Sequence, residues 1–130
     1  MASVVLVDSS FFIHRLRDRI DPLLELATYA AAWDLATCGM VMLEVCRGLR
    51  VPAMRSRYEA RFAEMQFAPT NFSTWERAAH LAHALDRAGK IVPAPDLVIA
   101  SCALAIDASI LTFDRHYQFI PGLRVLDRLD

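Results

Sequence analysis

The sequence has few cysteines, and they follow no pairing pattern. Cys38, Cys46 and Cys102 are odd in number, each lies in an apolar stretch, and no Cys-x-x-Cys or Cys/His ligand spacing accompanies them. This pattern excludes a disulfide framework and a structural zinc site. It indicates reduced core cysteines of a cytoplasmic protein.

Long apolar segments are also missing. The N-terminal apolar run is interrupted by Asp8 and has no basic residues before it, unlike a secretory signal peptide. No apolar run approaches the ~20 residues that a membrane-spanning helix needs. We therefore expect a cytoplasmic protein that does not associate with membranes.

Lysine is nearly absent, because 13 of the 14 basic residues are arginines and Lys90 is the single lysine. The net charge of −1 does not point to nucleic-acid binding by itself. Eight of the arginines lie between Arg15 and Arg61, however, which allows a local basic surface. Arginine can bind phosphate bidentately. A bias in composition with solvated helix faces explains the same arginines, and it is favoured on this feature alone.

What the sequence does contain is a chain suited to one compact domain. Its 130 residues are 55% apolar, which is enough for a substantial core. No linker, internal repeat or low-complexity segment divides it. We therefore expect a single domain over residues 1–130.

Short β-branched segments alternate with helical patterns along this domain. Strands are predicted at 3–7, 35–38, 66–68, 109–113 and 123–126. Helices are predicted at 10–18, from 22 to about 33, at 40–49, 52–65, 74–89 (capped by Ser73 or Thr74) and 96–106. Such alternation is typical of an α/β fold with a mostly parallel sheet and helices on both faces. Ligands of these folds bind outside the carboxyl ends of the strands.

Four acidic residues lie where they could form a site at that edge. Asp8 and Asp114 end predicted strands, Asp96 opens the apolar helix, and Glu44 is the only charged residue of MVMLEVC. Converging carboxylates raise one another's pKa unless a cation lies among them. Oxygen ligands of this kind suit Mg²⁺ and Mn²⁺.

Each acid also has an ordinary alternative. Asp8 and Asp96 suit the starts of helices, where an anion is favoured. Asp114 suits a turn. Glu44 is costly to bury alone, but Arg47 lies three residues on and can pair with it. The spacing alone leaves these alternatives beside the metal site.

The segments that carry the acids resemble PIN-domain ribonucleases, and VapC-type toxins in particular. The similar segments span nearly the whole chain and are VDSSFFI, MLEVCRGL, PDLVIASCAL and LTFDRHYQFIPGLRVLD. The resemblance implies a PIN-like three-layer α/β fold, with a central mostly parallel sheet flanked by helices. It implies that the catalytic residues, which also hold Mg²⁺ or Mn²⁺, are Asp8, Glu44, Asp96 and Asp114. It gives supporting roles to Ser9, Ser10 and Thr112.

One position departs from the family pattern. Many members carry a further aspartate where this chain has His116, so the rim loses a carboxylate, and whether one or two ions bind stays open. His14 and His116 each lie near an acid, and either proton transfer or plain hydrogen bonding suits them. His80 and His83 stand three apart on a helix, but an exposed polar face is favoured over a metal pair.

The resemblance further implies an endoribonuclease that cuts single-stranded or looped RNA and leaves a 5′-phosphate and a 3′-hydroxyl. Candidate RNA contacts are Arg15, Arg47 and Arg115, with solvated surface arginines as the alternative. A cognate antitoxin and a homodimer are the expected protein partners. Five apolar residues have two interpretations, an apolar docking groove for the partner or ordinary core packing: Phe11, Phe12, Leu16, Tyr58 and Phe62.

Two other function classes have to be compared with the nuclease. A catalytically weak PIN-like module that binds RNA or protein is the main alternative, since His116 replaces a carboxylate. A phosphoacceptor domain needs a second acid beside the first strand and a lysine after a late strand, and Lys90 lies at a predicted helix end instead. The four acids therefore favour the nuclease.

Overall fold

The computed structural model describes residues 3–130, and a five-stranded sheet lies at its centre. The strands are β1 (Ser3–Val7), β2 (Trp33–Cys38), β3 (Gln66–Ala68), β4 (Ser109–Leu111) and β5 (Val125–Leu126). All neighbours pair in parallel, in the order β3-β2-β1-β4-β5. The central position of β1 explains its continuous apolar run, because such a strand is covered on both faces.

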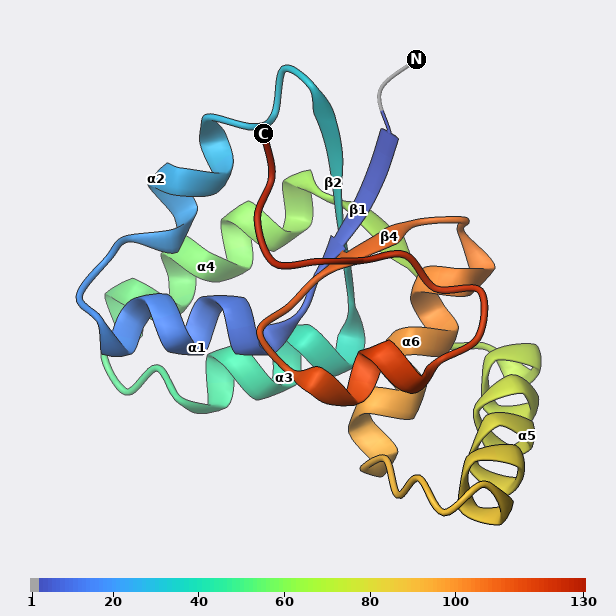
Figure 1. The fold of residues 1–130 in the computed structure, drawn as a ribbon. Coiled ribbons are helices and arrows are strands. Elements are labelled where there is room, and N and C mark those ends of the chain that lie inside the picture. Colours follow the sequence, from blue (N-terminus) through green and yellow to red (C-terminus); the bar gives the residue numbers. More distant parts are fainter. Residues whose placement is uncertain (1–2) are drawn as a thin grey trace.

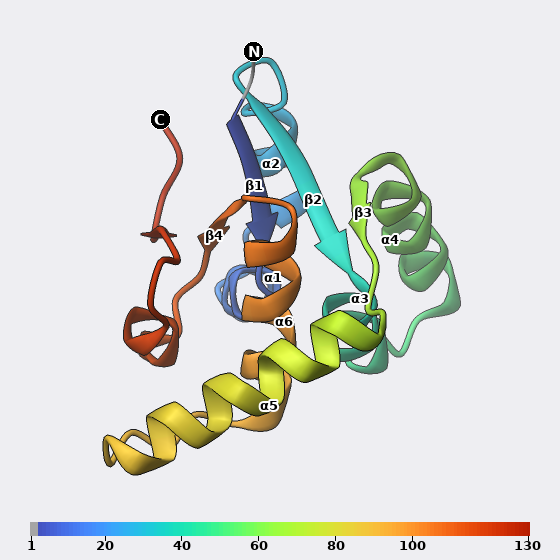
Figure 2. The ribbon, with the colours of Figure 1, turned by 90° about the vertical axis from the view of Figure 1, so that its right-hand side faces the viewer.

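Helices cover both faces of this sheet. They are α1 (Ser9–Arg17), α2 (Pro22–Ala27), α3 (Gly39–Arg47), α4 (Pro52–Glu64), α5 (Phe72–Arg87) and α6 (Ala94–Ala105), followed by the 3₁₀ helix η1 (Arg115–Phe119). In Figure 1, α1, α2 and α4 lie to one side of the strands and α5 and α6 to the other. Figure 2 shows α6 in front of the sheet and α1 and α2 behind it. The predicted three-layer α/β fold is confirmed.

No helix within residues 3–130 combines the length and the apolar character that a membrane crossing needs. The helix α3 lies beneath the carboxyl ends of the strands in Figure 1, and η1 lies at the same end. These two elements, with the starts of α1 and α6, surround the edge at which ligands bind in parallel folds.

Two predicted element boundaries are wrong for identifiable reasons. The helix expected to reach about residue 33 ends at Ala27, and β2 already begins at Trp33, which pairs with Ser3. The alanines at 30–32 are exposed, so no packing supports a longer helix there. The helix α5 is capped by Asn71, whose side chain accepts from Thr74 N at 3.1 Å, rather than by Ser73 or Thr74.

The residues suggested for an apolar docking groove belong instead to the core. Phe11, Phe12, Tyr58 and Phe62 are all buried. The ring of Phe12 lies 5.4 Å from that of Phe62 and 6.3 Å from that of Tyr58, between centroids. Leu16 is partly buried against the same cluster. These contacts join α1 to α4, and they decide in favour of the core interpretation.

Candidate metal centre

Asp8 is placed by the buried strand that precedes it. β1 ends at Val7, and Asp8 then forms the N-cap of α1, accepting from Ser10 N at 3.4 Å. The residue is only 2% exposed. Its carboxylate accepts from Ser10 Oγ at 2.7 Å, from Thr112 Oγ1 at 2.8 Å and from Tyr117 OH at 2.8 Å. Asp8 therefore caps a helix and also lies within a polar site, and its hydroxyl partners stabilise the buried charge.

Ser10 and Thr112 tie the ends of β1 and β4 together. Their hydroxyl oxygens are 3.0 Å apart. Ser10 Oγ accepts from Phe113 N at 3.0 Å, and Thr112 Oγ1 accepts from Asp114 N at 2.9 Å. The two hydroxyls thus fix the segment that carries Asp114 directly beside Asp8.

Asp96, Asp114 and His116 converge at the same edge. One ligand atom of each, a carboxylate oxygen or an imidazole nitrogen, lies within 4.8 Å of the others. His116 Nδ1 is 2.7 Å from Asp114 Oδ1 and 3.5 Å from Asp96 Oδ2. Asp114 also caps η1 by accepting from His116 N at 2.9 Å. Carboxylate oxygen and imidazole nitrogen are both common metal ligands.

The helices around the edge partly offset this concentration of negative charge. Asp8 and Asp114 are N-caps of α1 and η1, and Asp96 lies in the first turn of α6. Asp96 was expected at the start of that helix, but α6 begins two residues earlier, after Pro93. Helix N-termini carry partial positive charge, so three of them stabilise acids here.

That compensation is incomplete at Asp96. Burial and, after it, the neighbouring carboxylates of Asp114 and Asp8 together raise the pKa of Asp96 to about 7. Burial also raises the pKa of Tyr117, with the charges of Asp8 and Asp96 adding to the effect, so its hydroxyl stays protonated near neutral pH. A cation bound beside Asp96 would favour the charged form of this carboxyl group.

Tyr117 is a residue of this site that the sequence did not reveal. It is fully buried, and its hydroxyl donates to Asp8 Oδ1 while lying 3.4 Å from Asp96 Oδ1. The hydroxyl therefore links two acids that are 88 positions apart. Only a predicted helical turn after Asp114 would have indicated that a side chain three residues on points back to the acids.

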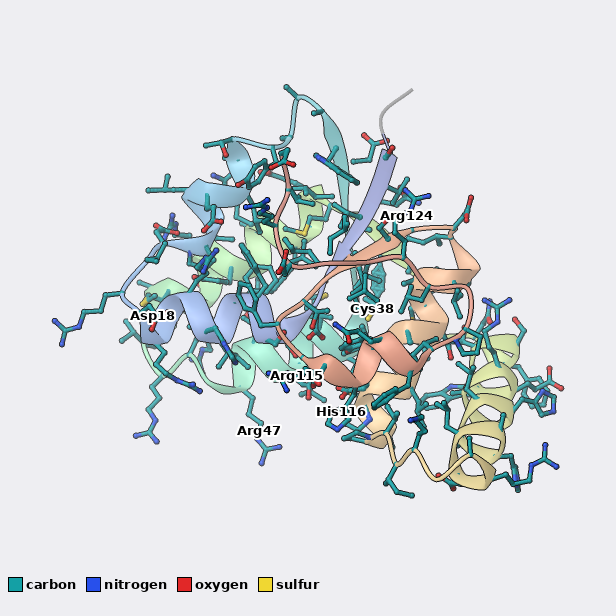
Figure 3. The ribbon with its side chains drawn as sticks, in the orientation of Figure 1. Asp18, Cys38, Arg47, Arg115, His116 and Arg124 are labelled. Carbon is teal, nitrogen blue, oxygen red and sulfur yellow. The ribbon has the colours of Figure 1, made fainter. Side chains whose placement is uncertain are left out.

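Glu44 approaches the site from α3 but stands apart from the tight cluster. It is half-buried and accepts from Ser9 Oγ at 2.9 Å. No ion pair joins it to Arg47 within residues 3–130, so the ion-pair alternative does not describe this glutamate. Arg47 is exposed, and Figure 3 shows it extending away from the protein body. Ser9 connects Glu44 to the residue next to Asp8.

The three candidate arginines differ in their surroundings. Arg15 Nε lies 2.8 Å from Glu25 Oε1, and its guanidinium carbon lies 5.0 Å from the centre of the Phe113 ring. Arg47 and Arg115 are exposed, and Figure 3 places both at the end of the molecule where His116 lies. Arg15 therefore has a structural environment, and the other two are exposed at the end of the molecule that carries His116.

The remaining histidines lie elsewhere. His14 packs on the ring of Phe113, with centroids 5.4 Å apart. His80 and His83 are exposed on α5. His80 and His83 do not belong to the possible ligand group found among residues 3–130, which agrees with the exposed polar face predicted for them.

Comparison with known proteins identifies relatives of this fold. The PIN domain family model matches residues 5–122. No curated protein matches the sequence. Similar solved structures include VapBC2 from Rickettsia felis bound to a DNA fragment from its promoter, at 19% identity over 98% of this chain and 99% of that chain, with a TM-score of 0.78.

Two further structures are similar over comparable lengths. DNA-bound VapBC from Salmonella typhimurium has 18% identity over 96% of this chain and 97% of that chain, with a TM-score of 0.76. VapBC-1 from nontypeable Haemophilus influenzae has 18% identity over 95% and 97%, with a TM-score of 0.74. At these identities the likeness shows a shared fold.

Proposed function

The chain belongs to the PIN domain family, and we propose that it is a metal-dependent endoribonuclease that acts as the toxin of a toxin–antitoxin pair. One observation carries the proposal. Asp8, Asp96 and Asp114, from three distant segments, meet with His116 at the carboxyl edge of the sheet. Carboxylates gathered in this way are what metal-assisted phosphodiester hydrolysis requires.

The residues present fit a divalent cation. His116 Nδ1 is buried without a hydrogen-bond partner among residues 3–130, although carboxylate oxygens lie next to it. Burial, together with the nearby charges of Asp114 and Asp8, raises the pKa of Asp96 to about 7, and a cation bound among these groups would relieve this effect. We propose that Mg²⁺ or Mn²⁺ is held, directly or through water, by Asp8, Glu44, Asp96 and Asp114.

A bound divalent ion supplies positive charge beside the scissile phosphate and lowers the pKa of water, which is why no catalytic cysteine or serine is needed. The side chains have separate tasks around it. Ser10, Thr112 and Tyr117 hold the carboxylate of Asp8 in place through their hydroxyl groups. Ser9 orients Glu44 in the same manner. Such supporting hydrogen bonds preserve the geometry of metal ligands.

RNA contacts are assigned to the two exposed arginines, Arg47 and Arg115, at the rim. Both can bind phosphate groups, and their contribution weakens as salt rises. The engagement of Arg15 with Glu25 and Phe113 leaves its guanidinium less available. We expect single-stranded or looped RNA to bind, because its backbone is not confined within a duplex and can approach a cation held at the open edge.

The proposed protein partners follow from the similar structures. The relatives from Rickettsia felis and Salmonella typhimurium are VapBC assemblies with DNA, and by analogy we propose a cognate antitoxin for this chain. A homodimer is proposed as well. Light scattering measures both assemblies, on the purified chain alone and after coexpression with a small protein encoded beside it. A monomer that binds no such protein would contradict both proposals.

The decisive experiment is cleavage of a mixed RNA pool with Mg²⁺, with Mn²⁺ and with EDTA. Asp8→Asn and Asp114→Asn should each abolish metal-dependent cleavage. Asp34→Asn is the matched control, because Asp34 is exposed near the start of β2, at the opposite edge of the sheet. Circular dichroism establishes that each variant is folded. Cleavage that persists in EDTA, or in both site variants, would contradict the proposal.

A binding module that does not cleave RNA is the second candidate, and His116 is the observation that favours it. An imidazole in place of a carboxylate lowers the negative charge available to an ion. A folded chain that binds RNA in gel-shift assays, but cuts none with either metal, would support this alternative.

A further inference from the structure

We propose that His116 binds the divalent ion of this site through Nδ1 and shifts the site's preference from Mg²⁺ toward Mn²⁺ and the later first-row metal ions. The inference rests on the metal site of the proposed function. It concerns a residue of this chain that departs from the all-carboxylate rim.

The position of the imidazole supports a ligand role. Nδ1 is buried, while the side chain as a whole is 41% exposed, so this nitrogen lies on the inner side of the ring. The backbone N of the same residue donates to Asp114 Oδ1 at 2.9 Å, which holds the ring beside that carboxylate. His116 therefore directs Nδ1 toward the interior of the site.

The distances are those of atoms that can share one ion. Ligand atoms that are neighbours in an octahedron around a small divalent ion, each about 2.1 Å from it, lie about 3.0 Å apart. Nδ1 lies 2.7 Å from Asp114 Oδ1 and 3.5 Å from Asp96 Oδ2, on either side of this value. These three side chains could therefore contribute ligand atoms to one divalent ion.

A simple ion pair between the imidazole and the acids explains the geometry less well. An ion pair of this length would direct the N–H of the ring at a carboxylate oxygen. Nδ1 instead has no hydrogen-bond partner among the described residues, although both oxygens are close. Nδ1, which is close to Asp96 and Asp114 but bonded to neither, is available to a cation that binds all three side chains.

The chemistry of the donor then determines the preferred metal. Mg²⁺ favours oxygen ligands, and it gains less from a neutral imidazole than from a carboxylate. First-row transition ions accept imidazole nitrogen well, and their affinity for such sites increases from Mn²⁺ onward. Replacing a carboxylate by His116 therefore weakens Mg²⁺ binding more than Mn²⁺ binding.

His116→Asp tests this directly, because it restores an all-carboxylate rim. Titration calorimetry on the metal-free full chain gives the Kd for Mg²⁺ and for Mn²⁺. We expect the ratio of the Mg²⁺ Kd to the Mn²⁺ Kd to fall about tenfold in this variant. His83→Asp, the same change at an exposed position of α5, should leave the ratio unchanged.

A spectroscopic measurement on the unaltered chain keeps the test independent of any variant's folding. Pulsed electron paramagnetic resonance of bound Mn²⁺ should show hyperfine coupling to a ligand nitrogen. That coupling should disappear in His116→Asp and remain in His83→Asp. Bound Mn²⁺ without nitrogen coupling, an unchanged affinity ratio, or no binding of either ion would each overturn the inference.

RNA cleavage separates this inference from the proposed function. A chain that holds Mn²⁺ through nitrogen but cuts no RNA retains the ligand role of His116 and loses the nuclease. Metal-dependent cleavage without nitrogen coupling would support the nuclease and refute the ligand role of His116.

Discussion

Two buried tyrosines of this protein differ in what their hydroxyl groups contact, and the difference allows a matched experiment. Tyr58 and Tyr117 are both 0% exposed. Tyr117 OH donates to the carboxylate of Asp8 at 2.8 Å. Tyr58 OH is buried without a hydrogen-bond partner anywhere in the described chain. Tyr117→Phe therefore removes a hydroxyl group that donates a hydrogen bond, and Tyr58→Phe removes a buried hydroxyl group that has no partner.

The expected losses follow from these contacts. A hydrogen bond to a charged group stabilises a protein by about 1.5–3 kcal/mol. Asp8 keeps its bonds from Ser10 and Thr112 in Tyr117→Phe, so we expect a loss of about 2 kcal/mol in the metal-free protein. Tyr58→Phe removes a hydroxyl that has lost its water and gained no partner, so we expect no loss, or a gain of up to about 1 kcal/mol.

Urea denaturation in EDTA, followed by circular dichroism, measures both free energies of unfolding. The denaturant slope should be the same for the two variants and the unaltered chain, because the buried area does not change. Equal losses in the two variants would refute the reasoning, since the hydrogen bond to Asp8 would then contribute nothing. A larger loss in Tyr58→Phe would refute it more strongly.

Three further predictions concern residues around the site. Because the pKa of Asp96 is raised from 3.8 to about 7, the native metal-free protein keeps a proton that the unfolded chain releases between these values. Its free energy of unfolding should therefore fall as pH rises from about 4 to about 7, and Asp96→Asn should flatten this profile in urea denaturation; an unchanged slope would contradict the cause given. Ser9→Ala should weaken Mn²⁺ binding about tenfold in calorimetry, because Glu44 loses its hydrogen bond, and unchanged affinity would argue against Glu44 as a ligand. Arg15→Met should lower the free energy of unfolding by about 1 kcal/mol and leave RNA cleavage unaltered, because its partner is Glu25; stable protein with lost cleavage would restore its RNA role.

The sequence predicted the fold class because its signals agree over long segments. The uninterrupted apolar run of β1 and the strand–helix alternation require a covered parallel sheet. The early end of α2 could not be read from the sequence, because alanines favour a helix whether or not anything packs on them. The periodic face with Tyr58 and Phe62 was open to two interpretations for a related reason. Periodicity marks an apolar face but not what covers it.

The candidate site divides in the same way. The acids at strand ends could be placed, because parallel strands finish at one edge, and Asp8 and Asp114 do lie at neighbouring strands. Tyr117 was not recognised, and the direction of the His116 ring could not be predicted, because both depend on η1, a short 3₁₀ turn without an apolar pattern. The double role of Asp8 was hidden too, since a cap and a site residue have the same local sequence.

The strand order also determines when the centre can exist during synthesis. β1 and β4 are neighbours in the sheet, and Asp8 receives hydrogen bonds from residues 104 and 109 positions later in the chain. At about 5–20 residues per second, a ribosome needs roughly 5–20 s to travel from Asp8 to Tyr117. Throughout that interval the nascent chain carries its first acids without the groups that organise them. Because of the strand order, the centre can therefore assemble only after the C-terminal part of the chain has been synthesised.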